Sequence, residues 1–155
     1  MNELVYRNLS EDAKRQICAW KYGGEYDLYN LPSYEEMQVR QIGFMNPQRE
    51  KNYYGFWDES ILVGFVNILE EKEEVFIGIG VNPDLCNKHY GQRMLLITYE
   101  ISKKLYPNKP LYLEVRTWNI RAVKCYQKAG FRIDGHANEL TPGIGTGTYY
   151  RMIRE

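Results

Sequence analysis

The stretch Val75-Phe76-Ile77-Gly78-Ile79-Gly80-Val81 decides the fold, because it leads through a short loop into a long amphipathic segment. Aliphatic residues occupy every second position from Val75 to Val81, which is typical of a strand with one face on a core. Gly78 and Gly80 fall on the other face, where the missing side chains let another backbone or a slim ligand approach closely. Asn82-Pro83-Asp84 then ends the strand, because proline cannot donate to a ladder and Asn and Asp favour turns.

A helix is predicted to begin near Tyr90, at the end of the loop that follows this strand. Apolar and aromatic residues recur there at helical spacing, namely Tyr90, Met94, Ile97, Ile101 and Leu105. The first turn of such a helix has backbone N–H groups without intrahelical partners and the positive end of the helix dipole. The junction of strand, loop and helix is therefore a predicted anion site, and phosphate is the usual occupant of such sites.

The loop Cys86-Asn87-Lys88-His89-Tyr90-Gly91, followed by Met94-Leu95, resembles the pyrophosphate loop of the GNAT family of N-acetyltransferases. That family has the pattern Arg/Gln-x-x-Gly-x-Gly/Ala before a pair of leucines. Cys86 stands where the family usually has Arg or Gln, and His89 stands where it has the first glycine. Lys88, Tyr90 and Gly91 fit the pattern.

A second segment, Asn119-Ile-Arg-Ala122-Val-Lys-Cys-Tyr126-Gln-Lys128-Ala-Gly130-Phe131, follows a predicted strand and resembles the second cofactor-binding segment of the same family. Gly91 and Asn119 are 28 positions apart. Two such segments in this order are much more specific together than either is alone.

The order of the predicted elements agrees with the resemblance. The pattern predicts strands at Glu3–Leu9, Tyr53–Trp57, Ile61–Leu69, Val75–Val81 and Leu111–Val115, helices at Glu11–Trp20, Tyr34–Arg40, Tyr90–Leu105 and after Asn119, and a closing hairpin of Arg132–Gly135 and Thr148–Ile153 around the glycine-rich loop Thr141–Gly147. Gly130 fits the C′ position of the last helix, closed by Phe131. We expect an α/β (α+β) fold with a mixed, mostly antiparallel central sheet flanked by helices, the GNAT-like acyl-CoA N-acyltransferase fold, in one domain over residues 1–155.

Charge and composition narrow the classes of partner. Twenty Lys and Arg balance twenty Asp and Glu, so no broad electrostatic footprint for nucleic acid is evident. No apolar stretch approaches the roughly twenty residues of a membrane span. The three cysteines are scattered, and no charged start followed by an apolar run opens the chain. We expect a cytoplasmic protein that binds neither nucleic acid nor membrane, as a monomer or a homodimer.

Two other kinds of site are weighed and rejected. The glycines of the central strand suggest a dinucleotide fingerprint, but they lie inside the strand and Pro83 stands where the third glycine belongs. Cys86 and His89 are spaced like metal ligands, yet no second pair follows at ligand spacing. We therefore predict no metal.

The resemblance implies acetyl-CoA (coenzyme A) as co-substrate. Amides at the helix start would hold the pyrophosphate, the backbone of the central strand would pair with the pantetheine arm, and Asn119 would contact the cofactor. The implied cofactor-binding residues are Ile79, Val81, Asn87, Lys88, His89, Tyr90, Gly91, Gln92 and Asn119. Position alone also makes Asn119 a plain helix N-cap, and both roles can hold.

Tyr126 is the implied catalytic residue, although periodicity alone makes it a core-facing tyrosine. Acyl transfer from a thioester expels a thiolate whose free pKa is about 8.5, whereas a phenol with a pKa near 10 still holds its proton at neutral pH. Tyr126 can therefore act as the general acid.

A general base is harder to find. In some relatives a Glu partway along the central strand helps the amine to lose its proton, but Val75–Ile79 contains no carboxylate. Glu70 and Glu74 are the nearest acids and only weak candidates, because a charged turn of this kind is usually a solvated turn. An amine with a pKa of about 10.4 costs roughly 4.6 kcal/mol to deprotonate at pH 7, and an α-amino group of pKa about 7.8 costs about 1 kcal/mol. Without a base, weakly basic amines are favoured.

We expect an acetyl-CoA-dependent N-acetyltransferase that moves an acetyl group directly from CoA to a primary amine of a small-molecule or peptide acceptor. The stretches that would shape the acceptor pocket carry no recognisable motif. The alternative is a non-catalytic acyl-CoA-binding or regulatory module. Cys86, His89 and the missing strand carboxylate favour that alternative, while Tyr126 favours the enzyme.

Overall fold

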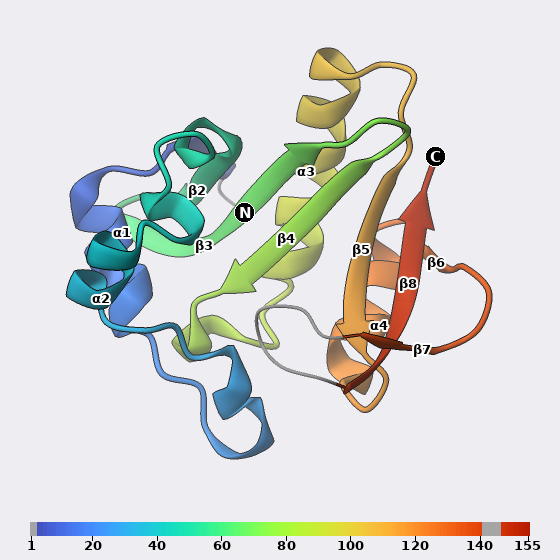
Figure 1. The fold of residues 1–155 in the computed structure, drawn as a ribbon. Coiled ribbons are helices and arrows are strands. Elements are labelled where there is room, and N and C mark those ends of the chain that lie inside the picture. The colour runs from blue at the N-terminus through green and yellow to red at the C-terminus, as the bar shows by residue number, and fades with distance from the viewer. Residues whose placement is uncertain (1–2, 141–146) are drawn as a thin grey trace. The chain divides into compact units, whose positions relative to one another are not determined.

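The computed structural model describes residues 3–140 and 147–155, and it has a mixed sheet flanked by helices (Figure 1). The strands are β1 (Val5–Asn8), β2 (Tyr53–Asp58), β3 (Ile61–Glu70), β4 (Val75–Val81), β5 (Leu111–Arg116), β6 (Arg132–Ile133), β7 (Asn138–Leu140) and β8 (Gly147–Arg154). The α-helices are α1 (Glu11–Ala19), α2 (Tyr34–Arg40), α3 (Tyr90–Leu105) and α4 (Ile120–Lys128), and short 3-10 helices are η1 (Gly24–Tyr29), η2 (Gly43–Met45), η3 (Glu50–Asn52) and η4 (Pro83–Leu85).

The sheet has the order β1-β2-β3-β4-β5-β8-β6, with β7 pairing to β8 outside this path. The pairs β1–β2, β2–β3, β5–β8, β6–β8 and β7–β8 are antiparallel, and β4 and β5 are parallel. This confirms the predicted mixed, mostly antiparallel sheet. Within the described ranges 3–140 and 147–155, no helix is long and apolar enough to cross a membrane.

The chain groups into two compact units, and each is described by itself. Unit 1 contains the residues up to Asn67 together with Ile79–Lys88, and unit 2 contains Ile68–Gly78 together with His89–Glu155. That residues 1–155 form one domain stays a prediction.

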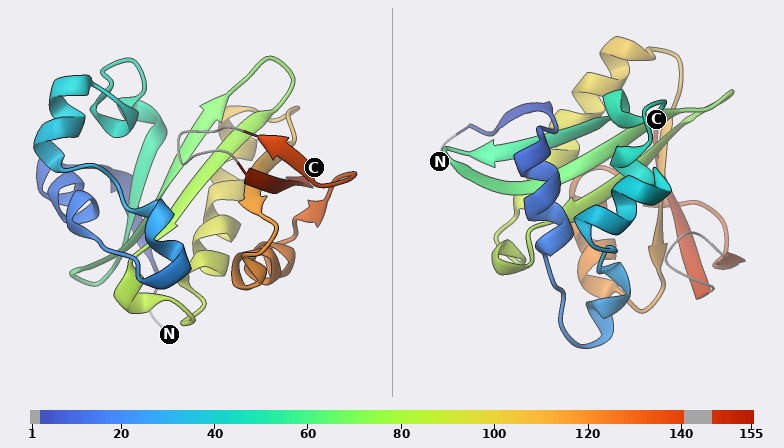
Figure 2. Two further views of the ribbon diagram at one scale, coloured as in Figure 1. Left: turned by 60° about the horizontal axis from the view of Figure 1, so that its bottom comes forward. Right: turned by 60° about the vertical axis from the view of Figure 1, so that its left-hand side comes forward.

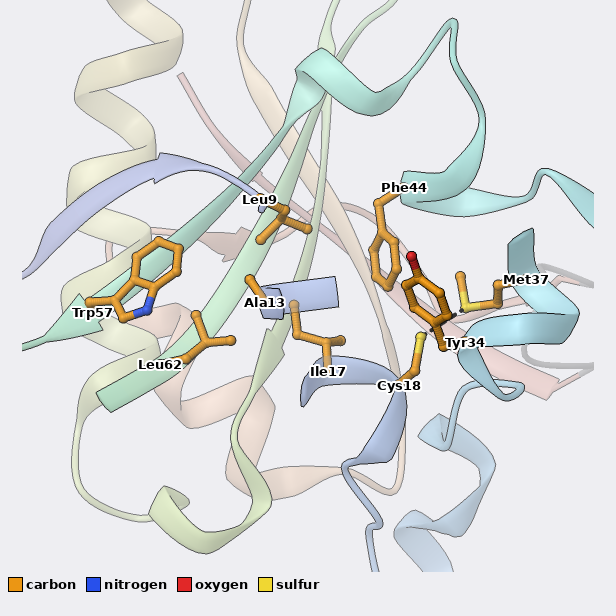
Figure 3. Packing of buried hydrophobic residues seen from close by; sticks show 9 residues of the cluster. All are labelled: Leu9, Ala13, Ile17, Cys18, Tyr34, Met37, Phe44, Trp57 and Leu62. Atoms are coloured by element: carbon orange, nitrogen blue, oxygen red, sulfur yellow. Dashed lines mark hydrogen bonds between the residues drawn. The ribbon is translucent and has the colours of Figure 1, made fainter. Parts of the chain in front are cut away.

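Helices α1 and α2 build the core of unit 1, and they lie side by side in Figure 2. Ser10 begins α1, because its hydroxyl accepts a hydrogen bond from the Ala13 amide at 3.1 Å. Figure 3 shows the buried cluster, which consists of Leu9, Ala13, Ile17, Cys18, Tyr34, Met37, Phe44, Trp57 and Leu62. The apolar face of α1 is therefore fixed on β2 and β3 by burial.

The two faces of strand β5 in unit 2 differ in burial. Leu111, Leu113 and Val115 are buried, whereas the residues between them are half-buried on the opposite face. Helices α3 and α4 contact each other, and α4 lies behind β5 in Figure 1. The core therefore lies on the helix side, and polar side chains from the other positions of β5 gather on the second face.

The C-terminal strands differ from the predicted hairpin. The prediction paired the segment after Phe131 with the last strand, and β6 and β8 do pair, with Arg132 opposite Ile153. However, β8 also pairs along β5, from Leu111 opposite Arg154 to Arg116 opposite Tyr149. Strand β8 is therefore an inner strand of the sheet, with β5 on one side and β6 and β7 on the other. The loop predicted at Thr141–Gly147 lies outside the described residues except for Gly147.

Candidate active site

Asn82 fixes the end of β4 in unit 1. Its amide donates to the Val63 carbonyl at 2.8 Å and its side-chain Nδ2 to the Leu62 carbonyl at 3.1 Å. Its Oδ1 accepts from the Asp84 amide at 3.0 Å, which caps η4 at Pro83. The Asn-Pro-Asp turn therefore ends the strand as predicted, and it also ties the following loop to β3.

The glycine face of β4 is occupied at Gly80. A side-chain Cβ built on Gly80 would lie 2.4 Å from Cε1 of Phe65, so the ring requires glycine there. The close neighbour in unit 1 is thus an aromatic ring, where the sequence predicted space for a backbone or a slim ligand.

The carbonyl of Val81 accepts a hydrogen bond from the Tyr22 hydroxyl at 2.6 Å. Asn30 holds Tyr22 in turn, because its Oδ1 accepts from the Tyr22 amide at 2.6 Å. Sequence reasoning missed this contact, since Tyr22 lies in a stretch without a motif. The assignment of Ile79 and Val81 to the pantetheine arm stays a prediction, and for Val81 it requires either the second carbonyl lone pair or displacement of Tyr22.

The loop before α3 contains two left-handed residues. Asn87 has φ 66° and His89 has φ 65°, and both side chains are exposed, as is that of Lys88. Asn tolerates this conformation, whereas a histidine pays about 1 kcal/mol or more for it. His89 occupies the position of the first glycine in the GNAT pattern, and its backbone conformation accounts for the preference for glycine there.

Helix α3 begins at Tyr90, as predicted, with His89 as its N-cap. In the described part of the chain the His89 side chain makes no capping hydrogen bond, and the first turn carries no acidic residue. The Arg93 guanidinium lies 5.4 Å above the Tyr90 ring and adds positive charge to this turn. Gly91 is buried and Gln92 half-buried. This start of a helix suits an anion such as a phosphate.

Helix α4 is fixed at both ends. Asn119 is buried, and its Oδ1 accepts from the Ala122 amide at 3.2 Å, so the predicted N-cap is confirmed. At the other end, the Gly130 amide donates to the Gln127 carbonyl and the Phe131 amide to the Tyr126 carbonyl, each at 3.0 Å. These two bonds form the predicted Schellman closure.

Tyr126 lies half-buried in the last turns of this helix. Because the Schellman closure engages its carbonyl and Asn119 fixes the first turn, the backbone that carries the phenol is held on both sides. The roles of Asn119 toward a cofactor and of Tyr126 as an acid stay predictions.

The two carboxylates predicted as weak base candidates are both ion-paired in unit 2. Glu70 accepts from Lys109 Nζ at 2.8 Å. Glu74 receives both terminal nitrogens of Arg151, one of them at 3.1 Å. Each carboxylate is already engaged by a cation, Glu70 by Lys109 and Glu74 by both terminal nitrogens of Arg151, so neither residue is favoured as the base.

Glu114 is a carboxylate that sequence reasoning missed. It lies on β5, half-buried, on the face opposite Leu113 and Val115. Burial raises the pKa of its carboxyl above the ordinary value, the charge of Arg151 lowers it, and Glu71 raises it further. The alternation of Leu111–Val115 is the sequence signal for it, because it puts Glu114 on the face of β5 away from the core.

The candidate residues divide between the two units. Unit 1 holds Ile79, Val81, Asn87 and Lys88, whereas unit 2 holds His89, Tyr90, Gly91, Gln92, Glu114, Asn119 and Tyr126. The chain itself joins the two sets, because Lys88 and His89 are consecutive. In unit 2 a helix start, a half-buried carboxylate and a half-buried phenol are thus held by one framework, and these are the groups that acyl transfer to an amine requires.

Comparison with known proteins agrees with this arrangement. The model of the acetyltransferase (GNAT) family matches residues 10–131. No protein with a curated description matches the chain significantly.

Several solved structures share the fold over nearly the whole chain. A chimera of spermidine N-acetyltransferase SpeG from Vibrio cholerae and hSSAT has a TM-score of 0.80 at 20% identity, covering 99% of this chain and 95% of that one. Spermidine N-acetyltransferase from Vibrio cholerae in complex with CoA and spermine has a TM-score of 0.76 at 20% identity, covering 97% and 94%. AAC(6')-Ib in complex with ribostamycin and coenzyme A has a TM-score of 0.73 at 16% identity, covering 99% and 93%.

At these identities the likeness to solved structures concerns the fold, whereas the family model matches most of the chain, including both segments that resemble cofactor-binding motifs. The chain is therefore an acyltransferase that belongs to the acetyltransferase (GNAT) family.

Proposed function

We propose that this protein transfers an acetyl group directly from acetyl-CoA to a primary amine. The observation that carries the proposal is the junction Asn87–Gln92, where two left-handed residues lead into a 16-residue helix. Within the described residues, the side chain of its N-cap, His89, makes no capping hydrogen bond. A diphosphate is the anion that such a helix start binds best, since it combines charge with several acceptor oxygens. The amides of His89 to Gln92, with Lys88 beside them, would hold the pyrophosphate of CoA.

In the proposed reaction, the amine nitrogen attacks the carbonyl carbon of the thioester and forms a tetrahedral intermediate. The nitrogen gives a proton to a base, the C–S bond breaks, and the departing sulfur takes a proton from an acid. We assign Glu114 as the base, because it is half-buried and, among the described residues, forms no close ion pair of the kind that holds Glu74. We assign Tyr126 as the acid, because the frame of α4 fixes its backbone. The products are an amide and CoA thiol.

The acceptor is proposed only as a class. Solved neighbours of this fold hold CoA together with amines, spermine in one structure and ribostamycin in another. A carboxylate base widens the range of acceptors beyond the weakly basic amines that a site without a base would favour. Cys18, Cys86 and Cys125 form no disulfide in the described structure, which supports a cytoplasmic protein. We propose a monomer or a homodimer.

Binding of the co-substrate is tested by thermal unfolding of the protein with acetyl-CoA and with CoA. A ligand at one hundred times its dissociation constant stabilises the folded state by about 2.7 kcal/mol, which raises the melting temperature by several degrees. Adenosine diphosphate serves as a control that carries only part of the ligand. A well-folded sample that shows no shift at millimolar acetyl-CoA and CoA would contradict both the enzyme and the binding-module hypotheses.

Turnover then separates these two hypotheses. Thiol release from acetyl-CoA is measured against a panel that contains a polyamine, an aminoglycoside, a lysine-containing peptide and a peptide with a free α-amino group. The enzyme releases thiol with at least one amine and loses this activity in Glu114→Gln. A protein that binds acetyl-CoA but shows no turnover with any amine would be the non-catalytic module.

A further inference from the structure

Arg151 is the centre of a charged network on the same face of unit 2 as Glu114. Strand β8 places Arg151 directly opposite Glu114 on β5. Its terminal nitrogens bind both oxygens of Glu74, and its Nε donates to Asp134 at 3.3 Å. Every nitrogen of the guanidinium is thus engaged by an acid from another strand or turn.

An aromatic ring fixes the plane of this guanidinium. Arg151 lies 4.4 Å above the centre of the Tyr112 ring, and the Tyr112 hydroxyl donates to Glu71 at 2.8 Å. Tyr112 is two residues before Glu114 on β5 and therefore on the same face. Stacking and bidentate pairing together hold an arginine in one orientation, which a lysine cannot reproduce.

We propose that Arg151 is a positioning residue for the base, which uses the Glu74 and Asp134 carboxylates and the Tyr112 ring to keep a fixed positive charge opposite Glu114. This inference rests on the proposed function, because it assigns Glu114 the role of general base. Arg151 itself does not touch the reacting atoms in this scheme. It acts through the charge and the orientation of the Glu114 carboxylate.

Groups of both charges surround the pair of Glu114 and Arg151 in unit 2. Arg151 and Glu71 act on Glu114 directly, and Glu74 and Asp134 bind Arg151. Tyr112 and Arg116 are the positions before and after Glu114 on the same face of β5. Burial and Glu71 favour the neutral carboxyl, and Arg151 favours the carboxylate. Burial and the hydrogen bond to Glu71 raise the pKa of the Tyr112 hydroxyl, so Tyr112 stays neutral where Glu114 titrates. The negative charges of Glu74 and Asp134 offset much of the positive charge of Arg151. The position of the guanidinium relative to Glu114 therefore decides how strongly it stabilises the Glu114 carboxylate.

The charge effect is tested by two neutral substitutions of opposite sign. Arg151→Gln removes the positive charge and should raise the pKa of Glu114, whereas Glu71→Gln removes a negative charge and should lower it. Glu71→Gln keeps an oxygen that can accept from the Tyr112 hydroxyl. The readouts are the carboxyl ¹³C titration of Glu114, identified by its loss in Glu114→Gln, and the acidic limb of the kcat/KM profile with one amine substrate for all variants.

Two further variants serve as controls. Arg151→Lys keeps the charge but loses the stacking and the bidentate pairing, so its Glu114 titration should lie between those of the wild type and Arg151→Gln. It also covers the case that Arg151→Gln does not fold. Arg132→Gln removes an exposed arginine of the same sheet that pairs with Glu155 at 3.0 Å, and it should move neither readout.

The two readouts separate the inference from the function. A Glu114 titration and an acidic limb that move together, upward in Arg151→Gln and downward in Glu71→Gln, support the role of Arg151. If the ¹³C titration of Glu114 is unchanged in both variants, the positioning role of Arg151 is overturned, even if the protein is an acetyltransferase. A titration that moves while the rate profile does not would overturn the assignment of Glu114 as base and, with it, the positioning role. Absence of turnover with every amine would instead contradict the proposed function.

Discussion

At the scale of single residues, the proposed role of Tyr126 as the general acid gives the sharpest prediction. Its hydroxyl is proposed to protonate the CoA thiolate, and Tyr126→Phe keeps the ring and its packing. We expect turnover to fall by roughly 10²- to 10⁴-fold, while acetyl-CoA binding and the melting temperature barely move. All three quantities are measured on one preparation with an amine already shown to be a substrate.

A matched variant controls for loss of a tyrosine hydroxyl as such. Tyr99 on α3 donates to the Glu155 carbonyl at 2.8 Å, so Tyr99→Phe removes a comparable hydrogen bond and should leave turnover intact. If Tyr126 is only a buried tyrosine, Tyr126→Phe should cost about 1 kcal/mol of stability with turnover of the folded fraction unchanged. That outcome would remove Tyr126 from the mechanism.

His89 offers a second test at this scale. Its φ of 65° is unfavourable for a side chain, and the exposed ring is expected to point away from a bound phosphate. His89→Gly should raise the free energy of unfolding by several tenths of a kcal/mol or leave it unchanged, because relief of strain opposes the greater freedom of glycine in the unfolded chain. CoA affinity should stay or improve, as isothermal titration calorimetry would report.

Gln41 provides the control, since it ends α2 with φ 51° and takes no part in the proposed site. Gln41→Gly should have a similar effect on stability and none on CoA affinity. A tenfold loss of affinity in His89→Gly alone, about 1.4 kcal/mol, would show that the ring binds the cofactor.

Local contacts of single residues could be predicted from the sequence, whereas contacts between distant residues could not. The caps at Ser10, Ser33 and Asn119 were readable, because capping is a local exchange of hydrogen bonds between neighbours in the chain. The Tyr22 contact with Val81 and the position of Arg151 opposite Glu114 were not, because each joins residues far apart in sequence. Glu114 differs from these, because the alternation of Leu111–Val115 already places it on the non-core face of β5.

At the scale of elements, the end of α4 depends on Gly130. Its φ is +97°, and a Cβ there would lie 2.8 Å from Nε of Arg154, whose Nη1 donates to the Ala129 carbonyl at 3.0 Å. Gly130→Ala should therefore destabilise the protein by about 1–3 kcal/mol. It should also lower turnover, because the Schellman closure holds Tyr126. Denaturant unfolding and steady-state kinetics measure both effects.

Gly135 is the matched control, with φ +75° and no heavy atom within 4 Å of a Cβ. Gly135→Ala isolates the cost of the backbone conformation, so it should destabilise the protein less and spare turnover. Equal effects of the two substitutions would mean that the contact of Arg154 with α4 contributes nothing.

Helix α1 is held by a buried cation. Lys14 is 2% exposed, and its Nζ pairs with Glu11 at 3.0 Å and with Glu50 at 2.6 Å. The acids are more than half exposed, so Lys14→Met returns them to water and should change stability by no more than about 1 kcal/mol. Glu11→Gln combined with Glu50→Gln leaves the ammonium buried without a charged partner and should cost about 3 kcal/mol.

The pH dependence of this cluster follows from the two pKa directions. Hydrogen bonds from the Tyr34 hydroxyl and from Lys14 lower the pKa of Glu11, so its contribution is present above the unfolded pKa near 4.5 and is lost as pH falls. Burial lowers the pKa of Lys14, but its bonds to Glu50 and Glu11 outweigh burial and raise it, so its contribution is lost only as pH rises above about 10.5. Urea unfolding should show a flatter acid limb in Glu11→Gln, and an unchanged limb would contradict this account.

Elements with strong periodicity were predicted to the residue. Helices α2 and α3 and strand β4 have the predicted bounds, because each combines a clear cap or breaker with one apolar face. The last strands were harder, since β8 pairs with β5 as well as with β6 and β7, and pairing partners distant in sequence leave no local signal.

At the scale of the whole molecule, two resemblances in the right order predicted the family, and the match of the family model over residues 10–131 confirmed it. The fold class followed from the order of elements, which is a property of the sequence alone. The acceptor did not follow, because its pocket is shaped by segments whose sequences vary with the substrate and carry no general motif.

The central claim is that the acetyl group passes from acetyl-CoA to an amine on this protein. The most direct test incubates the wild type with trideuteroacetyl-CoA and the amine panel, and then counts CoA thiol and labelled amide in the same sample by mass spectrometry. The account predicts one labelled amide for each thiol released, at a rate that Glu114→Gln and Tyr126→Phe both reduce. Thiol release without any labelled amide, or amide formation that both variants leave unchanged, would contradict it.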